Sequence, residues 1–326
     1  TKNSGIARGG VWEGYYAADP DFWKVNRKKF PRGLGPLSEA AQAQGLKLSL
    51  WFSPDSSGDF NNWERDAEIL LDFHRRLGVD LFKIDGVKLR SKQSEANLAA
   101  LYRHLMHESG DRLQFNPDLT AEVRAGYFYQ RAFGILFLEN RYTDWGNYYP
   151  YRTLRNLWDI ARILPARRFQ IEVLNPERNR DRYGDDPWAP CHYPMDYLFA
   201  VSIVANPLLF MELQHLSEEN IELLSHIVAL YRRYRDNLAQ LEIEPIGKRP
   251  DGTGISGFLG LERPNGEARQ LLLFRDLGDD SLFSLPPEAR RPWRELYESR
   301  PQVWEQIDEV TMRINSERSF IWLIKD

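Results

Sequence analysis

The feature that most constrains the fold is the alternation of short apolar runs with amphipathic segments along most of the chain. Residues 62–77 carry an apolar stripe at helical spacing, and Gly78 separates them from the strand-like run 79–85. The alternation recurs in predicted strands 46–52, 112–116, 134–139 and 167–173, and in predicted helices 38–45, 94–107 and 151–164. Strands that alternate with helices in this way form parallel β/α units, so the sequence predicts an α/β fold.

Polar residues follow the ends of the predicted strands. They are Asp55, Asp85, Asn116, Asp118, Glu139, Glu172 and Asn175. In a TIM-type (β/α)8 barrel, the C-terminal strand ends form the active-site face. A doubly wound open sheet would give the same alternation, but no glycine-rich loop follows any strand, which disfavours a nucleotide-binding sheet. We therefore expect a (β/α)8 barrel.

The pattern changes after a predicted helix over residues 218–237. Short alternating strands follow, and Pro264-Asn265-Gly266 has the composition of a hairpin turn. The sequence therefore predicts a barrel domain over residues 1–242 and a small antiparallel β domain over residues 243–326.

Composition narrows the classes of partner and cofactor. The net charge of −4 comes from 43 basic and 47 acidic residues, so nucleic acid and membrane are not expected partners. No apolar run reaches the roughly 20 residues of a membrane-spanning helix. Cys191 is the only cysteine and the six histidines form no metal-ligand pattern, so we expect no disulfide, metal or cofactor. The low cysteine content predicts a cytoplasmic location, with secretion as the alternative.

Two charged residues stand within one of the apolar strands, in the stretch LFKIDGVKL (81–89). Lys83 and Asp85 are two residues apart, so they point to the same side of an extended strand. A partly buried ion pair is the structural interpretation, but desolvating two charges costs several kcal/mol each. The sequence favours a functional interpretation, in which Asp85 is a nucleophilic carboxylate and Lys83 keeps it ionised.

A carboxylate nucleophile of this kind requires a second carboxyl that donates a proton. Retaining glycosidases place the two groups about 5–5.5 Å apart. Asp144 is the preferred acid/base because Trp145 beside it can desolvate it, and Glu139 is the alternative. The ten tryptophans, many in polar contexts, also suit a carbohydrate ligand, whose C–H face packs on aromatic rings.

Three segments carry a resemblance to glycoside hydrolase family 36. They are FPRGLGPLSEAAQAQGLKLSLWFSPD (30–55), FKIDG (82–86) and YTDWGNYYPYRTLRNLW (142–158). The first resembles the family's approach to a strand ending in "lWfePE", the second its "KWD" strand and the third its "WTSD" segment. The resemblance covers about residues 20–210. It implies a retaining α-galactosidase with a barrel, followed by a smaller β domain.

The resemblance also implies roles for individual residues. Asp85 matches the nucleophile, Lys83 a lysine that contacts sugar hydroxyls, and Trp51 a tryptophan of the sugar subsite. Asp144 matches the acid/base, whereas a shift of one register would favour Glu139. The remaining expected substrate contacts are Asp55, Asn116, Asp118, Trp145, Glu172 and Asn175.

The chain departs from the family pattern at the first barrel strand. The family's "DDGW" strand end is absent, and the stretch between Pro54 and Asn62 is short for a full β/α unit. We therefore expect a barrel without its first strand, completed by a second chain or an upstream segment. The expected substrate is a galactose-containing oligosaccharide or glycoside. The alternatives are a transglycosylase, a β-L-arabinopyranosidase, an α-N-acetylgalactosaminidase, or a non-catalytic carbohydrate-binding fragment or subunit.

Overall fold

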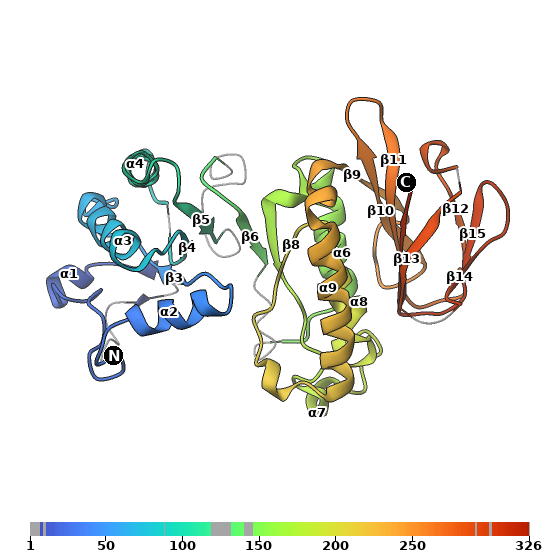
Figure 1. Cartoon of the computed structure of the whole chain (residues 1–326), viewed down its shortest axis with the longest axis horizontal. Coiled ribbons are helices and arrows are strands. Elements are labelled where there is room, and N and C mark those ends of the chain that lie inside the picture. Colours follow the sequence, from blue (N-terminus) through green and yellow to red (C-terminus); the bar gives the residue numbers. More distant parts are fainter. Residues whose placement is uncertain are drawn as a thin grey trace. The chain divides into compact units, whose positions relative to one another are not determined.

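The computed structural model describes residues 7–8, 11–87, 89–118, 132–139, 146–290, 292–299 and 302–325, without the side chains of residues 7, 8, 11, 138 and 139. The chain divides into two compact units, an N-terminal unit (Thr1–Leu138) and a C-terminal unit (Glu139–Asp326). In Figure 1 the N-terminal unit runs from blue to green and the C-terminal unit from green to red.

The N-terminal unit contains a parallel sheet with the strand order β3-β4-β5. Its strands are β3 (Ser49–Phe52), β4 (Leu81–Ile84) and β5 (Gln114–Pro117), and its helices are α1 (Tyr15–Ala18), α2 (Gly35–Ala43), α3 (Trp63–Leu77) and α4 (Lys92–Ser109). A short hairpin pairs β1 (Ala7–Arg8) with β2 (Val11–Trp12). The strand–helix alternation predicted from the sequence is therefore confirmed here (Figure 1).

The two long helices of this unit begin and end at residues suited to those positions. The Ser91 and Ser94 side chains form a capping box at the start of α4. α3 ends at Gly78 and α4 at Gly110, both in the left-handed conformation that glycine adopts without strain. Both helices pack on the sheet through one apolar core, whose buried members include Phe52, Leu70, Phe82, Leu101 and Phe115.

The strand β6 (Leu136–Glu139) lies at the boundary between the two units. A parallel bridge joins Phe137 of β6 to Asp118, directly after β5. The parallel arrangement therefore continues past β5 within the N-terminal unit.

The C-terminal unit begins with further β/α structure. Its described elements are α6 (Pro150–Ala161), η1 (Ala166–Arg168), β7 (Phe169–Glu172), α7 (Arg180–Tyr183), η2 (Pro190–His192), α8 (Met195–Ala200), β8 (Asn206–Leu208), η3 (Leu213–His215) and α9 (Glu218–Gln240). β7 and β8 pair in parallel, with Ile171 opposite Pro207. Ser217 caps the start of α9 by accepting a hydrogen bond from the Asn220 amide.

Antiparallel strands follow α9, as the sequence predicts. They are β9 (Glu242–Gly247), β10 (Ile255–Glu262), β11 (Glu267–Arg275), β12 (Leu282–Ser284), β13 (Arg294–Glu298), β14 (Trp304–Gln306), β15 (Thr311–Ile314) and β16 (Ser319–Ile324), with η4 (Pro287–Ala289) between β12 and β13. They form a five-stranded sheet, β13-β16-β11-β10-β9, and a three-stranded sheet, β12-β15-β14. β10 and β11 form the predicted hairpin, with Glu262 opposite Glu267.

Two boundaries differ from the expectations. The sequence predicts no helix or strand before residue 38, yet α1 forms there, and its Tyr15 and Tyr16 are buried. The compact units divide at residues 138/139, whereas the predicted domain boundary at 242/243 lies inside the C-terminal unit and stays a prediction.

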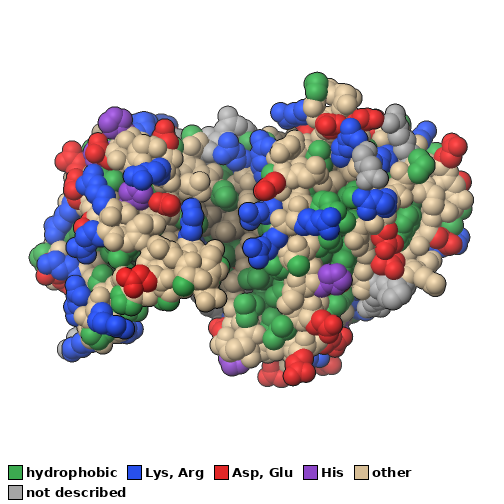
Figure 2. All heavy atoms as spheres, viewed as in Figure 1, with side chains coloured by type: hydrophobic (Ala, Val, Ile, Leu, Met, Phe, Trp, Pro, Cys, Tyr) green, Lys and Arg blue, Asp and Glu red, His purple; other side chains and the backbone are tan. Residues whose placement is uncertain are grey.

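The composition is reflected in the surface charges and in the character of the helices. Acidic and basic side chains are interspersed on the face of the molecule shown in Figure 2. Within the described ranges, no helix combines the length and the apolar character that a bilayer crossing requires.

Candidate active site

The three strand ends of the N-terminal sheet bring the predicted site residues of that unit together. Trp51 on β3 lies opposite Lys83 on β4, and Lys83 lies opposite Asn116 on β5. The ladder continues past the strand ends, because the Asp85 amide donates to the Phe52 carbonyl over 3.0 Å. Side chains in one such row point to the same face of the sheet. These residues therefore share one face at the C-terminal edge of the sheet.

The Asp85 carboxylate is held by two N–H donors. The Trp51 indole Nε1 donates to Oδ2 over 3.2 Å, and the Gly86 amide donates to Oδ1 over 2.6 Å. Gly86 has a φ of 65°, which turns the chain directly after Asp85 at little steric cost. The side chain is half-buried at the end of β4. The predicted nucleophile is thus an oriented carboxylate that solvent can reach.

Lys83 lies over an aromatic ring and beside a buried carboxylate. Its Nζ is 3.9 Å from the centre of the Phe137 ring and 3.8 Å from Oδ2 of Asp118. The Lys83 side chain is 26% exposed and that of Asp118 is 1% exposed. The ammonium group therefore balances charge at the strand ends while one side of it stays accessible. Asn116 is buried and donates to the Ile135 carbonyl over 2.7 Å, which fixes its amide.

Asp55, one of the expected substrate contacts, forms hydrogen bonds within the protein. It is fully buried, and its carboxylate accepts hydrogen bonds from the Gly14 amide, the Ser57 amide and the Asn62 side chain over 2.8 to 3.1 Å. A carboxylate that accepts several local hydrogen bonds stabilises a loop. In the described structure Asp55 supports the loop that follows β3.

A buried carboxylate that the sequence analysis missed lies behind this loop. Asp66 on α3 accepts hydrogen bonds from the Tyr15 and Tyr16 hydroxyls and from the Asp55 amide. Burial raises its pKa to about 7, against the hydrogen bonds that favour its charged form. Asp66 is a charged residue on the apolar side of the predicted helix 62–77, and this position could have indicated a buried carboxylate.

Aromatic rings gather around Trp51. Trp12 lies edge-on to it with ring centres 5.4 Å apart, and Trp23 lies 6.1 Å away. Trp51 remains 39% exposed. A half-exposed indole beside a carboxylate suits a sugar ring, whose apolar face can pack on the indole.

The remaining predicted residues belong to the C-terminal unit. Glu172 ends β7 and is buried, and Asn175 follows, where its side-chain oxygen accepts from the Glu177 amide over 2.9 Å. Glu139 is the last residue of β6, and its side chain lies outside the described structure. Asp144 and Trp145 also lie outside the described residues. Their predicted roles stay predictions.

Asp186 accepts several hydrogen bonds in this unit, and the sequence analysis did not single it out. Asp186 accepts from the Asn147 side chain over 2.9 Å, from the Tyr149 hydroxyl over 2.7 Å and from the Trp188 amide over 3.1 Å. The pKa of Tyr149 is raised, and the hydrogen bond to Asp186 is the largest cause. Asp186 therefore ties the segment before α6 to the loop after α7.

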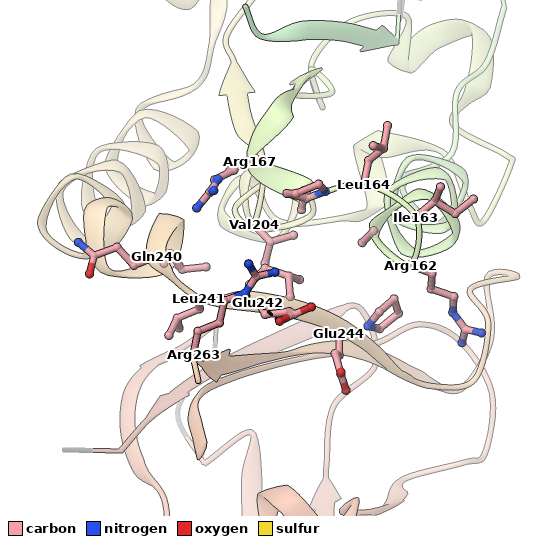
Figure 3. Close-up of a pocket in the computed structure, with 16 residues that line it drawn as sticks. Arg162, Ile163, Leu164, Arg167, Val204, Gln240, Leu241, Glu242, Glu244 and Arg263 are labelled. Atoms are coloured by element: carbon pink, nitrogen blue, oxygen red, sulfur yellow. Dashed lines mark hydrogen bonds and ion pairs between the residues drawn. The ribbon is translucent and has the colours of Figure 1, made fainter. Parts of the chain in front are cut away.

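A cavity of about 610 Å³ in the C-terminal unit lies away from these residues (Figure 3). Its lining includes residues 161–167, just before β7, and Val204, just before β8, so it opens at the N-terminal ends of those strands. Arg263 in its wall donates to Glu242 over 2.9 Å. None of the candidate site residues lines it, and Glu172 lies at the other end of β7.

Metal ligation finds no support in the described part of the chain. No group of three or more His, Cys, Asp or Glu side chains there could hold a metal ion.

Comparisons with known proteins give the following likenesses. No protein-family model matches the chain. The curated α-galactosidase Mel36A of Lactobacillus acidophilus is 54% identical over 33 residues, which is 10% of this chain and 4% of that protein. The crystal structure of the α-galactosidase from Lactobacillus brevis matches with a TM-score of 0.61 and 13% identity, over 93% of this chain and 48% of that one. A family 36 α-galactosidase variant, AgaA A355E D548N from Geobacillus stearothermophilus in complex with raffinose, matches with a TM-score of 0.59 and 15% identity, over 83% and 41%.

At these identities the structural likeness shows the fold. The chain spans less than half the length of the two α-galactosidase structures and a small part of the curated relative. The predicted α/β architecture with a C-terminal antiparallel sheet is confirmed, and so is the resemblance that the sequence motifs indicated. The chain has the fold of the α-galactosidases of glycoside hydrolase family 36, over about half of their length.

Proposed function

We propose that this chain carries the catalytic residues of a retaining glycoside hydrolase that removes terminal α-linked galactose. One observation carries the proposal. Asp85, at the C-terminal end of a parallel strand in an α-galactosidase-like fold, is oriented by Trp51 and Gly86, and Lys83 lies two residues before it on the same face of the sheet. An oriented, accessible carboxylate has the properties that a glycosyl nucleophile needs.

The proposed architecture is a (β/α)8 barrel over residues 1–242 with a C-terminal β domain over 243–326. The parallel pairs β3-β4-β5 and β7-β8, with helices between strands, support it. In this proposal the first barrel strand comes from an upstream segment or a second chain.

The proposed reaction is a double displacement. Asp85 attacks the anomeric carbon, the bond to the leaving oxygen breaks, and Asp144 gives that oxygen its proton. Asp144, now ionised, takes a proton from water, whose oxygen displaces Asp85 and releases the sugar with its original configuration. Glu139, the last residue of β6, is the alternative acid/base.

The substrate in this proposal is a galactose-containing oligosaccharide. Trp51 would pack on the sugar ring, and Lys83 would bind its hydroxyl groups. The other proposed contacts are Asn116, Asp118, Trp145, Glu172 and Asn175. Support comes from two similar structures of Geobacillus stearothermophilus AgaA variants, which contain raffinose and stachyose.

Hydrolysis of 4-nitrophenyl α-galactoside tests the proposal, with the purified chain alone and with a co-expressed upstream segment. We expect Asp85→Ala to abolish turnover while the circular dichroism spectrum stays unchanged. Asp80→Ala is the matched control, because Asp80 precedes the same strand and pairs with Lys47 over 3.6 Å. Asp80→Ala is expected to retain activity.

Product analysis separates the alternatives. Time-resolved NMR should show α-galactose as the first product, and initial release of β-galactose would contradict a retaining mechanism. Transfer of galactose to an added sugar would indicate a transglycosylase. Sugar binding without turnover under both conditions would indicate a non-catalytic carbohydrate-binding subunit.

A further inference from the structure

The Trp12 ring contacts the tryptophan that holds Asp85. Trp12 lies edge-on to Trp51, with ring centres 5.4 Å apart and an interplanar angle of 66°. The Trp51 indole in turn donates to the Asp85 carboxylate over 3.2 Å. Trp51 is 39% exposed, and the Trp23 ring also lies near it, with ring centres 6.1 Å apart. The orientation of the Trp51 ring therefore depends on neighbouring rings such as that of Trp12.

Trp12 is itself fixed to the loop that follows β3. Its carbonyl accepts hydrogen bonds from the Ser56 amide over 3.0 Å and from the Ser56 hydroxyl over 2.8 Å. Two residues further on, the Gly14 amide donates to the buried Asp55 carboxylate over 2.8 Å. The backbone of Trp12 is thus tied to the segment that follows Trp51 on β3. This makes Trp12 a fixed support for the indole.

A second tie comes from α1. The Tyr15 and Tyr16 hydroxyls donate to the buried Asp66 carboxylate over 3.0 and 2.5 Å. Asp66 also accepts from the Asp55 amide over 2.9 Å. One buried carboxylate therefore joins the segment that carries Trp12 to the loop after β3.

We infer that Trp12 is a positioning residue for the proposed reaction, because its ring holds the Trp51 indole in the orientation that donates to Asp85. The inference rests on the proposed function and adds to it a residue outside the motifs that resemble family 36. Trp12 acts through Trp51 and need not touch the reacting atoms.

A double-mutant cycle on kcat/KM for 4-nitrophenyl α-galactoside tests this coupling. Trp51→Phe removes one hydrogen bond to a charged acceptor, and we expect a loss of about 10-fold. We expect Trp12→Ala to cost about 3-fold, since the indole then samples other orientations. The double variant should lose no more than Trp51→Phe alone, whereas independent effects would multiply to about 30-fold.

The pH profile gives a readout that a purely structural role would not change. Loss of the indole donor disfavours the ionised carboxylate, so the acid limb of kcat/KM should move to higher pH in both single variants. Trp304→Ala is the matched control, because Trp304 belongs to a C-terminal sheet and donates to Glu295 there. It should leave the rate and the acid limb unchanged.

Each outcome decides the inference. Multiplying losses, or an unmoved acid limb in Trp12→Ala, would overturn it while leaving the proposed function intact. An inactive wild-type chain, or an active Asp85→Ala variant, would overturn the proposed function and the inference together. If Trp12→Ala fails to fold, Ser56→Ala replaces it in the cycle, since it removes the hydroxyl tie to Trp12, and the same non-multiplying loss is expected.

Discussion

Replacing Asp66 with asparagine should remove a pH-dependent loss of stability from the N-terminal unit. The Tyr15 hydroxyl lies 3.0 Å both from the Ser53 carbonyl oxygen and from Oδ1 of Asp66, and it has one proton to donate. A protonated Asp66 can donate to Tyr15 while Tyr15 donates to Ser53, so the neutral carboxyl satisfies both contacts. Burial is the largest cause of the raised pKa of Asp66.

The size of the effect follows from the two pKa values. The pKa of Asp66 is about 7 in the folded chain, and its ordinary value is 3.8. Between these values the folded chain holds a proton that the unfolded chain has released. The associated stability is fully present below pH 3.8 and is lost as pH rises through about 7. A shift of roughly 3 units corresponds to about 4 kcal/mol of unfolding free energy.

Urea unfolding monitored by tryptophan fluorescence measures this loss. Asp66→Asn resembles the neutral carboxyl in having no charge. Its NH₂ group can donate to the Tyr15 and Tyr16 hydroxyl oxygens, and its oxygen can accept from the Asp55 amide. Relative to wild type, it should gain about 4 kcal/mol between about pH 4 and pH 8. Asp72→Asn is the matched control on the same helix, because Asp72 is exposed and pairs with Arg76 over 3.2 Å. Equal pH slopes for wild type and Asp66→Asn would refute the reasoning.

Three further substitutions test other parts of the structure. Asp276→Asn should remove a smaller pH-dependent loss of unfolding free energy from the C-terminal unit, about 3 kcal/mol, because burial raises the pKa of Asp276 to about 6. If the pH dependence of the unfolding free energy in urea were the same in wild type and variant, this prediction would be contradicted. Asp55→Ala removes the acceptor of three hydrogen bonds and should cost about 2–4 kcal/mol in thermal unfolding, so a cost below about 1 kcal/mol would argue against its loop-supporting role. Gly86→Ala places a side chain at a φ of 65° and should destabilise the chain by about 1 kcal/mol and lower kcat/KM through Asp85; unchanged kinetics would contradict this.

The strand–helix alternation could be predicted because its signals are local. Gly78 was expected to end a helix and does so in the left-handed conformation. It was also predictable that Lys83 and Asp85 share one face at the end of a parallel strand. The two residues are two apart, and side chains alternate along a strand with a period of two.

The parts that could not be predicted depend on contacts distant in sequence. The sequence predicts no element at residues 15–18, yet α1 forms there, and its buried Tyr15 donates a hydrogen bond to Asp66, 51 residues away. Asp55 is expected to contact substrate, which stays a prediction, and the sequence did not indicate that its oxygens accept from the Gly14 amide, the Ser57 amide and the Asn62 side chain. Residue type and spacing identify a polar strand end, but they do not show which donors the fold brings to it.

Chemical rescue by azide tests the role of Asp85 most directly. In Asp85→Ala, azide can attack the anomeric carbon from the side that the missing carboxylate would occupy. Turnover of 4-nitrophenyl α-galactoside by this variant should return with azide and give β-galactosyl azide, identified by NMR. Rescue of Asp144→Ala should instead give α-galactosyl azide, and rescue of a Glu139 variant in its place would move the acid/base role to Glu139. Turnover by Asp85→Ala at the wild-type rate without azide, or rescue that yields the α-azide, would contradict Asp85 as the nucleophile.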